Sequence, residues 1–174
     1  TLIDLAGMKA INTVLLDNID SGAGNPWAAA WSADSQTLCV THSGTHEISV
    51  INVPALLQKL ARLSATPDPK QLANYSSATR TAGDVPNDLA FLVGLRQRLK
   101  QGENDRGPRA LAFAGSRVYA ANYFSDTLSV LDLAGSRPNL RSVPLGPPQA
   151  MTVVREGEAL FNDATICFQG WQSC

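Results

Sequence analysis

Residues 37–53, TLCVTHSGTHEISVINV, recur without a gap as residues 117–133, RVYAANYFSDTLSVLDL. Apolar and polar residues alternate with period two in both stretches, a pattern typical of half-buried β-strands. A short polar turn divides each stretch, at residues 43–45 in the first and at residues 124–126 in the second. Each stretch therefore predicts a β-hairpin, and the chain repeats one hairpin design twice.

Each predicted hairpin is flanked by two further candidate strands. A short apolar stretch that opens with proline precedes each hairpin, PWAAAW at residues 26–31 and PRALAF at residues 108–113. Residues 95–100 and residues 140–145 predict an outer strand for the first and the second unit. Each unit is therefore expected to be a sheet of four antiparallel strands.

Four antiparallel strands per repeat are typical of a β-propeller blade. Such a sheet cannot bury both faces alone, so the sheets of a propeller stack around an axis and cover one another. Residues 2–5 and 13–16 predict the last two strands of an earlier blade. We therefore expect an all-β fold, an incomplete propeller fragment with about two complete blades, because a closed propeller needs roughly four to eight. Its open blade edges are expected to be exposed or covered by other chains.

The repeat units resemble the YVTN-type β-propeller repeat, named for a strand that reads Tyr-Val-Thr-Asn. Residues 39–42, CVTH, and residues 119–122, YAAN, each match two of these four positions. Residues 32–36, SADSQ, resemble the family's Ser-Pro-Asp-Gly-Lys turn, and its apolar-Ser-Val-apolar-Asp strand is matched by ISVIN and LSVLD. The resemblance covers residues 1–150 except for an insertion at about residues 54–94. It implies a fold and does not by itself imply a chemical activity.

Composition and charge exclude several classes of protein. Of the 174 residues, 44% are hydrophobic and 17% are charged, which is incompatible with a disordered chain. The formal net charge is -1, so no basic field exists to attract nucleic acid. The longest strongly apolar stretch, near residues 89–95, is far shorter than the roughly 20 residues that cross a bilayer, and no membrane span is expected. The chain begins at Thr1 and stops at Cys174, and we expect it to be a piece of a longer protein.

The insertion at residues 54–94 is predicted to be partly helical. Pro54 is followed by leucines at helical spacing, and TPDP at residues 66–69 breaks the helix. Asn87 is a candidate cap of a second short helix that ends near Leu95. Because the blades are occupied with packing, such an insertion is a candidate recognition site. The alternative function is therefore a non-enzymatic binding propeller of the periplasm or cell surface.

Residues 151–174 differ in character from the repeats and predict a linker and the start of a truncated cytochrome c-like domain. REGEALF at residues 155–161 has helical spacing and is ended by Asn162-Asp163. It is similar to the opening of a class of c-type cytochromes, in which Gly-x-x-Leu-Phe lies on the first helix. In propeller proteins fused to a cytochrome c peroxidase-like domain, the next segment leads into Cys-x-x-Cys-His. The resemblance assigns Cys174 to the first cysteine of that motif.

This resemblance implies a β-propeller platform of an exported redox protein, periplasmic or extracellular, that supports or docks a c-type haem domain for electron transfer. The parent protein would be a haem-dependent, peroxidase-like oxidoreductase, and the partner of this chain would be the missing haem domain or a redox protein. Covalent haem needs two thiols and an adjacent imidazole. The chain supplies at most one such thiol, so haem c is expected in the parent and catalysis is not expected of this chain alone. The alternative for Cys174 is a free cysteine or a disulfide with Cys167.

Two histidines form a second candidate site. His42 and His46 flank the first predicted turn and are a candidate metal pair, although a tetrahedral zinc site takes more ligands than two. The alternative is that His42 fills the Asn position of the repeat and hydrogen-bonds the turn. A central metal would imply a second alternative function, a metal-dependent propeller hydrolase or lactonase.

The remaining candidates have structural alternatives. Trp27 and Trp31, four residues apart on one predicted strand, are expected to share a face and to pack between blades. Cys39 is expected to be a buried, unreactive small hydrophobe. Four basic side chains are expected to form a patch on a solvated outer face, with steering of an acidic redox partner as the alternative role: Arg96, Arg98, Lys100 and Arg109.

Overall fold

The structure is mostly β, with three antiparallel sheets and two α-helices in the part of the chain that is described. The computed structural model describes residues 1–63, 65, 79–147 and 149–173. Sheet 1 consists of β3 (Pro26–Trp31), β4 (Thr37–His42), β5 (Glu47–Asn52) and β6 (Arg96–Lys100). Sheet 2 consists of β7 (Pro108–Ala114), β8 (Arg117–Asn122), β9 (Thr127–Asp132) and β10 (Asn139–Pro144). Strands that follow one another in sequence are neighbours in each sheet, which confirms the two predicted four-stranded units.

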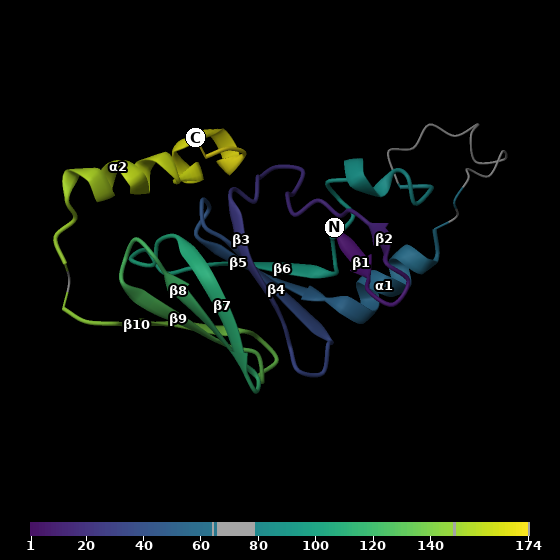
Figure 1. Ribbon diagram of the computed structural model, residues 1–174, viewed down its shortest axis with the longest axis horizontal. Helices are drawn as coiled ribbons and strands as arrows, with labels where there is room; N and C mark the ends of the chain where they lie inside the picture. The colour runs from purple at the N-terminus through teal and green to yellow at the C-terminus, as the bar shows by residue number, and fades with distance from the viewer. Residues whose placement is uncertain (64, 66–78, 148, 174) are drawn as a thin grey trace.

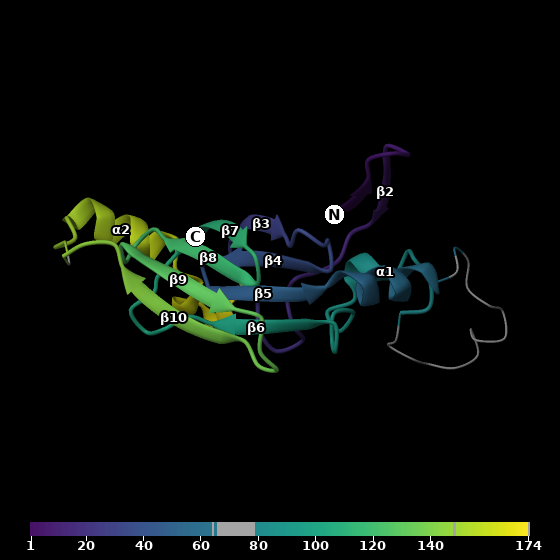
Figure 2. The same cartoon turned by 90° about the horizontal axis from the view of Figure 1, so that it is seen from below.

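The two sheets are stacked, with β3 and β4 against β7 (Figures 1 and 2). Cys39 and Ile48 from sheet 1 and Val118, Ala120 and Leu131 from sheet 2 are buried between them. Burial raises the pKa of the Cys39 thiol to about 12, so this cysteine is the unreactive core residue that its sequence context predicts. No closed ring of blades is formed by these two sheets.

The first strand of each sheet, β3 in sheet 1 and β7 in sheet 2, has a β-bulge at its first residues. A bulge inserts one extra residue and interrupts the alternation of side chains between the two faces. Trp31 lies opposite Leu38, whose side chain packs on the core away from sheet 2. The ring of Trp27 instead lies 4.3 Å from the guanidinium carbon of Arg109 on β7. The prediction that Trp27 and Trp31 share a face is therefore wrong, because the bulge separates them.

The face of sheet 1 that points away from sheet 2 is covered by the insertion. Helix α1 (Val53–Ala61) starts where Asn52 Oδ1 accepts a hydrogen bond of 3.0 Å from the Ala55 N–H, and it buries Leu56 and Leu60 against β4 and β5. The predicted first helix is thus confirmed. The predicted second helix is wrong: Asn87 ends a short 3-10 helix, η1 (Val85–Asn87), and turns follow it. The predicted break at residues 66–69 lies outside the described residues.

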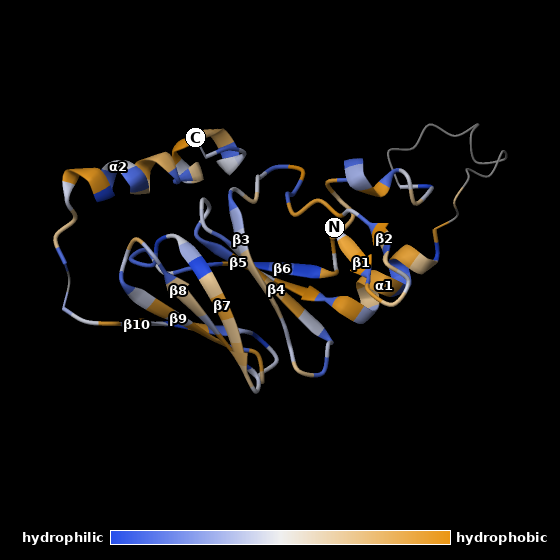
Figure 3. Ribbon diagram, in the orientation of Figure 1, coloured by the Kyte–Doolittle hydropathy of each residue, from blue (hydrophilic) through white to orange (hydrophobic). Residues whose placement is uncertain are grey.

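The N-terminal hairpin differs from the prediction in the position of its second strand. β1 (Leu2–Asp4) pairs with β2 (Lys9–Asn12), and not with residues 13–16. The Asp4 carboxylate accepts hydrogen bonds from the N–H groups of Ala6 and Gly7, at 3.1 and 3.2 Å, and so closes a tight turn directly after β1. Figure 3 shows apolar residues on β1, β2 and α1, and Figure 2 shows the β1–β2 hairpin projecting away from the sheets.

The chain after sheet 2 forms the predicted helix, α2 (Val153–Phe161). Thr152 Oγ1 accepts from the Arg155 N–H at 3.3 Å, and the helix stops at Asn162, as its sequence predicts. Two 3-10 turns follow, η2 (Ala164–Ile166) and η3 (Phe168–Gly170). Among the described residues, no helix has the length and apolar character that a bilayer crossing requires.

Candidate functional site

The C-terminal segment, residues 152–171, lies across one end of both sheets, which we call the rim (Figure 1). The rim consists of the β4–β5 turn, the β8–β9 turn and the loops before β3 and β7. Each loop is tied to the neighbouring turn in the same way, since Ser43 N–H donates to Asn25 O at 2.8 Å and the equivalent Tyr123 N–H donates to Gly107 O at 2.8 Å. The repeat thus builds a matched pair of turns, and the C-terminal segment binds to both.

Backbone and amide groups attach the C-terminal segment to sheet 1. The Ala164 N–H donates to Gly44 O at 2.9 Å, and the Gly22 N–H donates to Gln169 O at 2.9 Å. A Cβ added at Gly22 would lie 2.4 Å from the Gly170 carbonyl oxygen, so this approach requires glycine. The segment and the loop before β3 are therefore in direct backbone contact.

Charged side chains attach the same segment to sheet 2. Arg109 donates to Glu158 Oε1 at 3.2 Å, and Arg155 donates to the carbonyl of Tyr123. The guanidinium of Arg109 also stacks among three aromatic rings, 4.3 Å from Trp27, 4.2 Å from Tyr123 and 4.7 Å from Phe124. Such cation–π contacts between a guanidinium and an aromatic face are attractive. Arg109 is thus part of the contact between the sheets and α2, and not of a solvated basic patch.

Asp163 joins both sheets to the C-terminal segment. Its carboxylate is buried, accepts from Arg106 Nη2 at 2.8 Å and from the Thr165 N–H at 2.9 Å, and lies 3.5 Å from His46 Nε2. Burial alone would raise the pKa of Asp163, but the hydrogen bonds from Thr165 and Arg106 and the neighbouring His46 outweigh it and hold the pKa below its usual value. Asp163 is therefore held as a carboxylate between His46 at the rim of sheet 1 and Arg106 at the rim of sheet 2.

His46 makes the third connection at this point. The Gly107 N–H donates to His46 Nδ1 at 3.1 Å, which leaves Nε2 facing Asp163. His46 has a positive φ of 56°, and Asp126, at the equivalent position of the second hairpin, has a φ of 52°. The same left-handed turn therefore presents a histidine in sheet 1 and a carboxylate in sheet 2, and the two project toward the C-terminal segment, where Asp126 lies 3.6 Å from Arg155.

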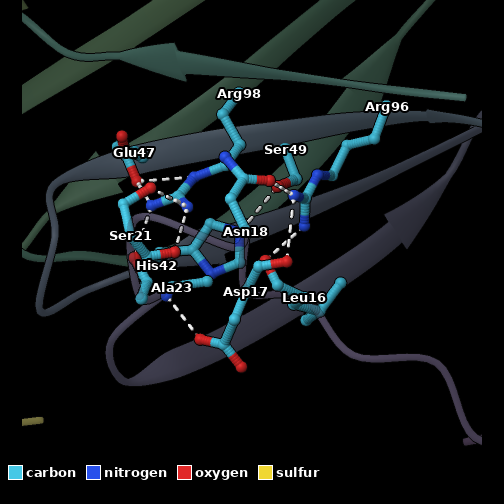
Figure 4. Close-up of polar contacts among 11 residues, drawn as sticks. Leu16, Asp17, Asn18, Ser21, Ala23, His42, Glu47, Ser49, Arg96 and Arg98 are labelled. Carbon is cyan, nitrogen blue, oxygen red and sulfur yellow. Dashed lines mark hydrogen bonds and ion pairs between the residues drawn. The ribbon is translucent and has the colours of Figure 1, made fainter. Parts of the chain in front are cut away.

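A second polar cluster holds the loop before β3 against sheet 1 (Figure 4). Arg98 donates to Gly22 O at 2.6 Å, to Ser21 O at 3.1 Å and to Glu47. Arg96 donates to the Leu16 carbonyl and to the Asn18 side chain. The loop before β3 folds back over β6, and its carbonyl groups accept hydrogen bonds from Arg96 and Arg98. Neither guanidinium group is therefore free in solvent. The predicted solvated patch of Arg96, Arg98, Lys100 and Arg109 is therefore wrong; among these four, Lys100 remains exposed.

His42 lies inside this cluster and not on the rim. It is fully buried, and its Nε2 is 2.7 Å from Ser49 Oγ. Burial, helped by the charges of Arg98 and Arg96, lowers the pKa of His42 to about 3, so the ring is neutral at physiological pH. His42 and His46 thus have different partners. The part of the chain that is described has no group of three or more His, Cys, Asp and Glu side chains arranged for a metal, and metal binding by this pair stays a prediction.

The candidate haem anchor, Cys174, lies outside the described residues. Cys167 is half-buried and forms no disulfide with another described residue. Covalent haem needs two thiols and an adjacent histidine, and the described residues do not fit it, because Cys167 has no neighbouring histidine and both imidazoles, His42 and His46, are engaged elsewhere. The haem anchor and the pairing of Cys167 with Cys174 stay predictions.

Sequence reasoning did not identify the rim as a site. The contact between the rim and the C-terminal segment joins three separate stretches of the chain, which hold His46, then Arg106 and Arg109, then Glu158 and Asp163. The glycines at positions 22, 24 and 44 were a local signal, because they mark close backbone approach. The segment that approaches them lies more than a hundred residues later in the sequence, which no local pattern reveals.

The comparisons with known proteins agree on fold alone. No protein-family profile and no curated protein matches the chain. A solved structure of hydrazine synthase from Kuenenia stuttgartiensis has a similar fold, with a TM-score of 0.59 and 23% identity. The match covers 76% of this chain and 34% of that chain, so the chain spans about a third of the length of its structural neighbour.

Proposed function

We propose that this chain is part of a β-propeller platform that holds the first residues of a c-type haem domain in an exported redox protein. The observation that carries the proposal is the attachment of residues 152–171 to the rim, with Asp163 bound to residues of both sheets. A segment anchored at several points has little freedom, so the residues that follow it would start from a fixed place beside the blades. A rigid platform needs this arrangement to present a second domain.

The proposal assigns the chemistry to residues beyond the described part of the chain. A bound c-type haem would supply reversible one-electron transfer, and the residues described here would hold and orient the segment that leads to it. Cys174 is proposed as the first attachment cysteine, on its resemblance alone. The likeness to part of hydrazine synthase supports the fold of the platform, and the proposal takes no reaction from it.

The test uses the full-length gene product, expressed with the machinery that attaches haem to exported proteins. We expect haem that stays with the polypeptide under denaturing conditions and a c-type absorption spectrum after reduction. Cys174→Ser should abolish the covalent attachment, whereas Cys39→Ser, in the core between the sheets, should retain it. Absence of covalent haem in the wild-type product would refute the proposal. Fractionation of the expressing cells tests export.

A groove on sheet 1 favours a second candidate function, a binding propeller. The groove has a volume of about 510 Å³ and lies where the insertion leaves and rejoins the sheet. Its lining is polar at Gln36, Thr37, Asn52 and Gln97, charged at Arg96, and otherwise formed by Val50, Ile51, Pro54, Gly94 and Leu95. Ligand sites of proteins have volumes of roughly 300–1,000 Å³. Amide and hydroxyl side chains donate and accept hydrogen bonds, so a neutral polar ligand such as an oligosaccharide fits this lining.

The test of this second candidate is titration of the chain with neutral oligosaccharides, measured by calorimetry. Binding should be lost in Gln97→Trp, which fills the groove from the exposed side of β6, and kept in Lys100→Trp on the same strand. Absence of heat with the wild-type chain would count against a glycan-binding propeller.

A further inference from the structure

A buried carboxylate in the loop before β7 has no cationic partner within the part of the chain that is described. Asp105 is 2% exposed, and its Oδ1 accepts hydrogen bonds of 2.6 Å from Thr127 Oγ1 and from Ser142 Oγ. None of the ion pairs among the described residues includes Asp105. Because a buried charge is costly unless an opposite charge compensates it, this carboxylate requires a positive partner that the described side chains do not provide.

Two amide side chains beside Asp105 have oxygens without a hydrogen bond. Gln101 and Asn122 are 6% and 2% exposed, and their nitrogens donate to the same hydroxyl, Ser129 Oγ, at 2.9 and 2.8 Å. Asn122 Nδ2 also donates at 3.0 Å to Thr127 Oγ1, the group that donates to Asp105. Because the oxygen and the nitrogen of an amide are bonded to one carbon, both amide oxygens lie beside these hydroxyls. Neither Gln101 Oε1 nor Asn122 Oδ1 has a described partner, which is rare for a buried polar atom.

Sheet 1 has a positive charge at the equivalent place. Ser49 is the repeat equivalent of Ser129, as the gap-free alignment of the two hairpins gives. The pairing registers place Arg98 opposite Ser49 in sheet 1 and Ser142 opposite Ser129 in sheet 2. Figure 4 shows the guanidinium of Arg98 between the loop before β3 and the carboxylate of Glu47. The same place in the first repeat therefore holds a carboxylate together with a cation.

Sheet 2 has a carboxylate at this place but no built-in cation among its described residues. The carboxylate comes from the loop, since Asp105 precedes Pro108 by three residues, where sheet 1 has Ala23 before Pro26. Ser142 occupies the position of the arginine, so β10 brings no positive charge to Asp105. The groups gathered here are a carboxylate, two amides and several hydroxyls, all of which offer oxygen atoms.

We propose that the cluster around Asp105 is a calcium site between the loop before β7 and sheet 2. The ligands are the Asp105 carboxylate and the amide oxygens of Gln101 and Asn122, with hydroxyl oxygens and water completing the set. Ca²⁺ accepts irregular sets of roughly six to eight oxygens, whereas Mg²⁺ demands a near-ideal octahedron. A set drawn from a loop and from β8, β9 and β10 favours Ca²⁺. It contains one carboxylate, so it differs from sites built of several His, Cys, Asp and Glu side chains, of which the described residues have none.

The calcium site fixes the loop that binds the C-terminal segment. The Arg106 N–H donates to Ser125 Oγ at 3.0 Å, and Ser125 Oγ lies 2.9 Å from Thr127 Oγ1 in the same cluster. The Arg106 side chain in turn donates to Asp163. Bound calcium should therefore raise the midpoint of thermal unfolding and slow amide exchange in residues 101–107.

The test is calorimetric titration of the 174-residue chain with CaCl₂ at constant ionic strength, after a chelator has removed bound metal. Affinity for Ca²⁺ depends on the number of charged ligands, so a site with one carboxylate should bind one ion per chain with a dissociation constant on the order of 10⁻⁴–10⁻³ M. MgCl₂ under the same conditions should bind about tenfold more weakly. Saturating Ca²⁺ should raise the thermal midpoint of the wild type.

Variants of the cluster locate the site. Asp105→Asn removes the charge and should weaken Ca²⁺ binding about tenfold. In chelator this variant should be at least as stable as the wild type, because it removes an uncompensated buried charge, and in saturating Ca²⁺ it should be less stable. Ser142→Arg gives sheet 2 the cation that Arg98 provides in sheet 1, and it should remove the response to Ca²⁺. Glu103→Gln, an exposed carboxylate of the same loop, is the matched control and should bind like the wild type.

Three results would overturn the proposal. The first is a wild-type chain that binds no Ca²⁺, which would indicate water between Gln101 and Asn122. The second is an equal effect of Ca²⁺ and Mg²⁺, which would indicate screening of surface charge. The third is a Ca²⁺ response that Glu103→Gln removes and Asp105→Asn retains. If Asp105→Asn does not fold, amide exchange of the wild type makes the same test, since Ca²⁺ should slow exchange in residues 101–107 and leave that of β3 unchanged.

Discussion

His42 and Asn122 occupy the same position in sheet 1 and sheet 2, and each forms a hydrogen bond to the equivalent serine. His42 Nε2 lies 2.7 Å from Ser49 Oγ, and Asn122 Nδ2 lies 2.8 Å from Ser129 Oγ. Both side chains are buried. The repeat therefore conserves a buried polar link between its second and third strands, and sheet 1 makes it with a group that can be protonated.

This difference predicts that His42→Asn makes the protein less sensitive to acid. The folded-state pKa of His42, about 3, lies below the ordinary histidine value of 6.5, so the unfolded chain binds a proton that the folded chain does not. Stability is then lost as the pH falls from about 6.5 toward 3, by on the order of 3 kcal/mol between pH 7 and pH 4. Asparagine keeps the link to Ser49 without titrating. Urea unfolding of both proteins at pH 7 and pH 4 measures the difference.

The matched control for this prediction is Ser49→Ala, which removes the partner of His42 but leaves the titrating ring in place. It should lower stability at both pH values and keep the loss between them. If His42→Asn loses as much stability between pH 7 and pH 4 as the wild type does, groups other than His42 cause the loss.

The strands could be predicted from sequence because their pattern is local. The period-two alternation of residues 37–53 and 117–133 needs only neighbouring residues, and both hairpins have the predicted turns. The second N-terminal strand was predicted at the wrong residues, because its position depends on the turn that the Asp4 carboxylate closes. Alternation alone does not specify where such a turn ends.

The candidate site depends on contacts that sequence spacing does not encode. Arg96 and Arg98 lie on an outer strand, and their sequence context predicts that solvent surrounds them. In the structure, residues 16–22 fold back over this strand and accept hydrogen bonds from both side chains. The rim has the same origin, because Asp163 meets His46 and Arg106 only once the chain returns across both sheets. A bulge of one residue was enough to separate Trp27 from Trp31.

Asp163→Asn should release the C-terminal segment without unfolding the sheets. The change removes the charge that Arg106 and His46 face, and because the Arg106 side chain is partly exposed, the loss is that of a hydrogen bond to a charged group, about 1.5–3 kcal/mol. Hydrogen exchange of residues 152–171 should rise, while that of β4 and β8 stays slow. Glu156→Gln, an exposed carboxylate of the same helix, is the control and should change neither.

The same carboxylate predicts a pH dependence of this attachment. The folded-state pKa of Asp163 is below its usual value, so its stabilisation is present above the unfolded pKa and is lost as the pH falls through the folded pKa. The protection factors of the amides of residues 152–171, corrected for the intrinsic pH dependence of exchange, should therefore fall at acid pH in the wild type and depend less on pH in Asp163→Asn. Equal pH dependence in the two proteins would contradict the assignment.

Arg109→Lys should weaken the attachment of α2 although it keeps the positive charge. A lysine ammonium does not provide the planar group that lies over Trp27, Tyr123 and Phe124, and such stacking contributes about 1 kcal/mol. Thermal unfolding should show a lower midpoint for Arg109→Lys. Arg141→Lys, on an exposed position of β10, should leave the midpoint unchanged.

Gly22→Ala should displace the C-terminal segment, because the new Cβ would lie 2.4 Å from the Gly170 carbonyl oxygen and 2.5 Å from the Trp171 Cα. Overpacking of this kind costs about 1–3 kcal/mol. The control is Gly157→Ala in α2, where a Cβ meets nothing within 4 Å and the helix gains about 1 kcal/mol. Limited proteolysis should therefore cleave the segment faster in Gly22→Ala and no faster in Gly157→Ala.

Arg98→Met should be the most destabilising single change in sheet 1, because it leaves several buried groups without a partner. The Arg98 side chain is 9% exposed and donates to Glu47 and to the carbonyls of Ser21 and Gly22. Removal of one member of a buried ion pair costs about 3–5 kcal/mol, since the other charge stays desolvated. Lys100→Met, exposed on the same strand, should change stability by less than about 0.5 kcal/mol.

The double variant Arg98→Met/Glu47→Gln separates the charge from the hydrogen bonds to the loop. Glutamine removes the stranded carboxylate, so the double variant should recover part of the stability that Arg98→Met loses. The loop carbonyls of Ser21 and Gly22 remain without their donor in both variants, and the amides of residues 17–24 should exchange faster in both. If the double variant recovers nothing, the loop contacts rather than the ion pair to Glu47 account for the stabilising effect of Arg98.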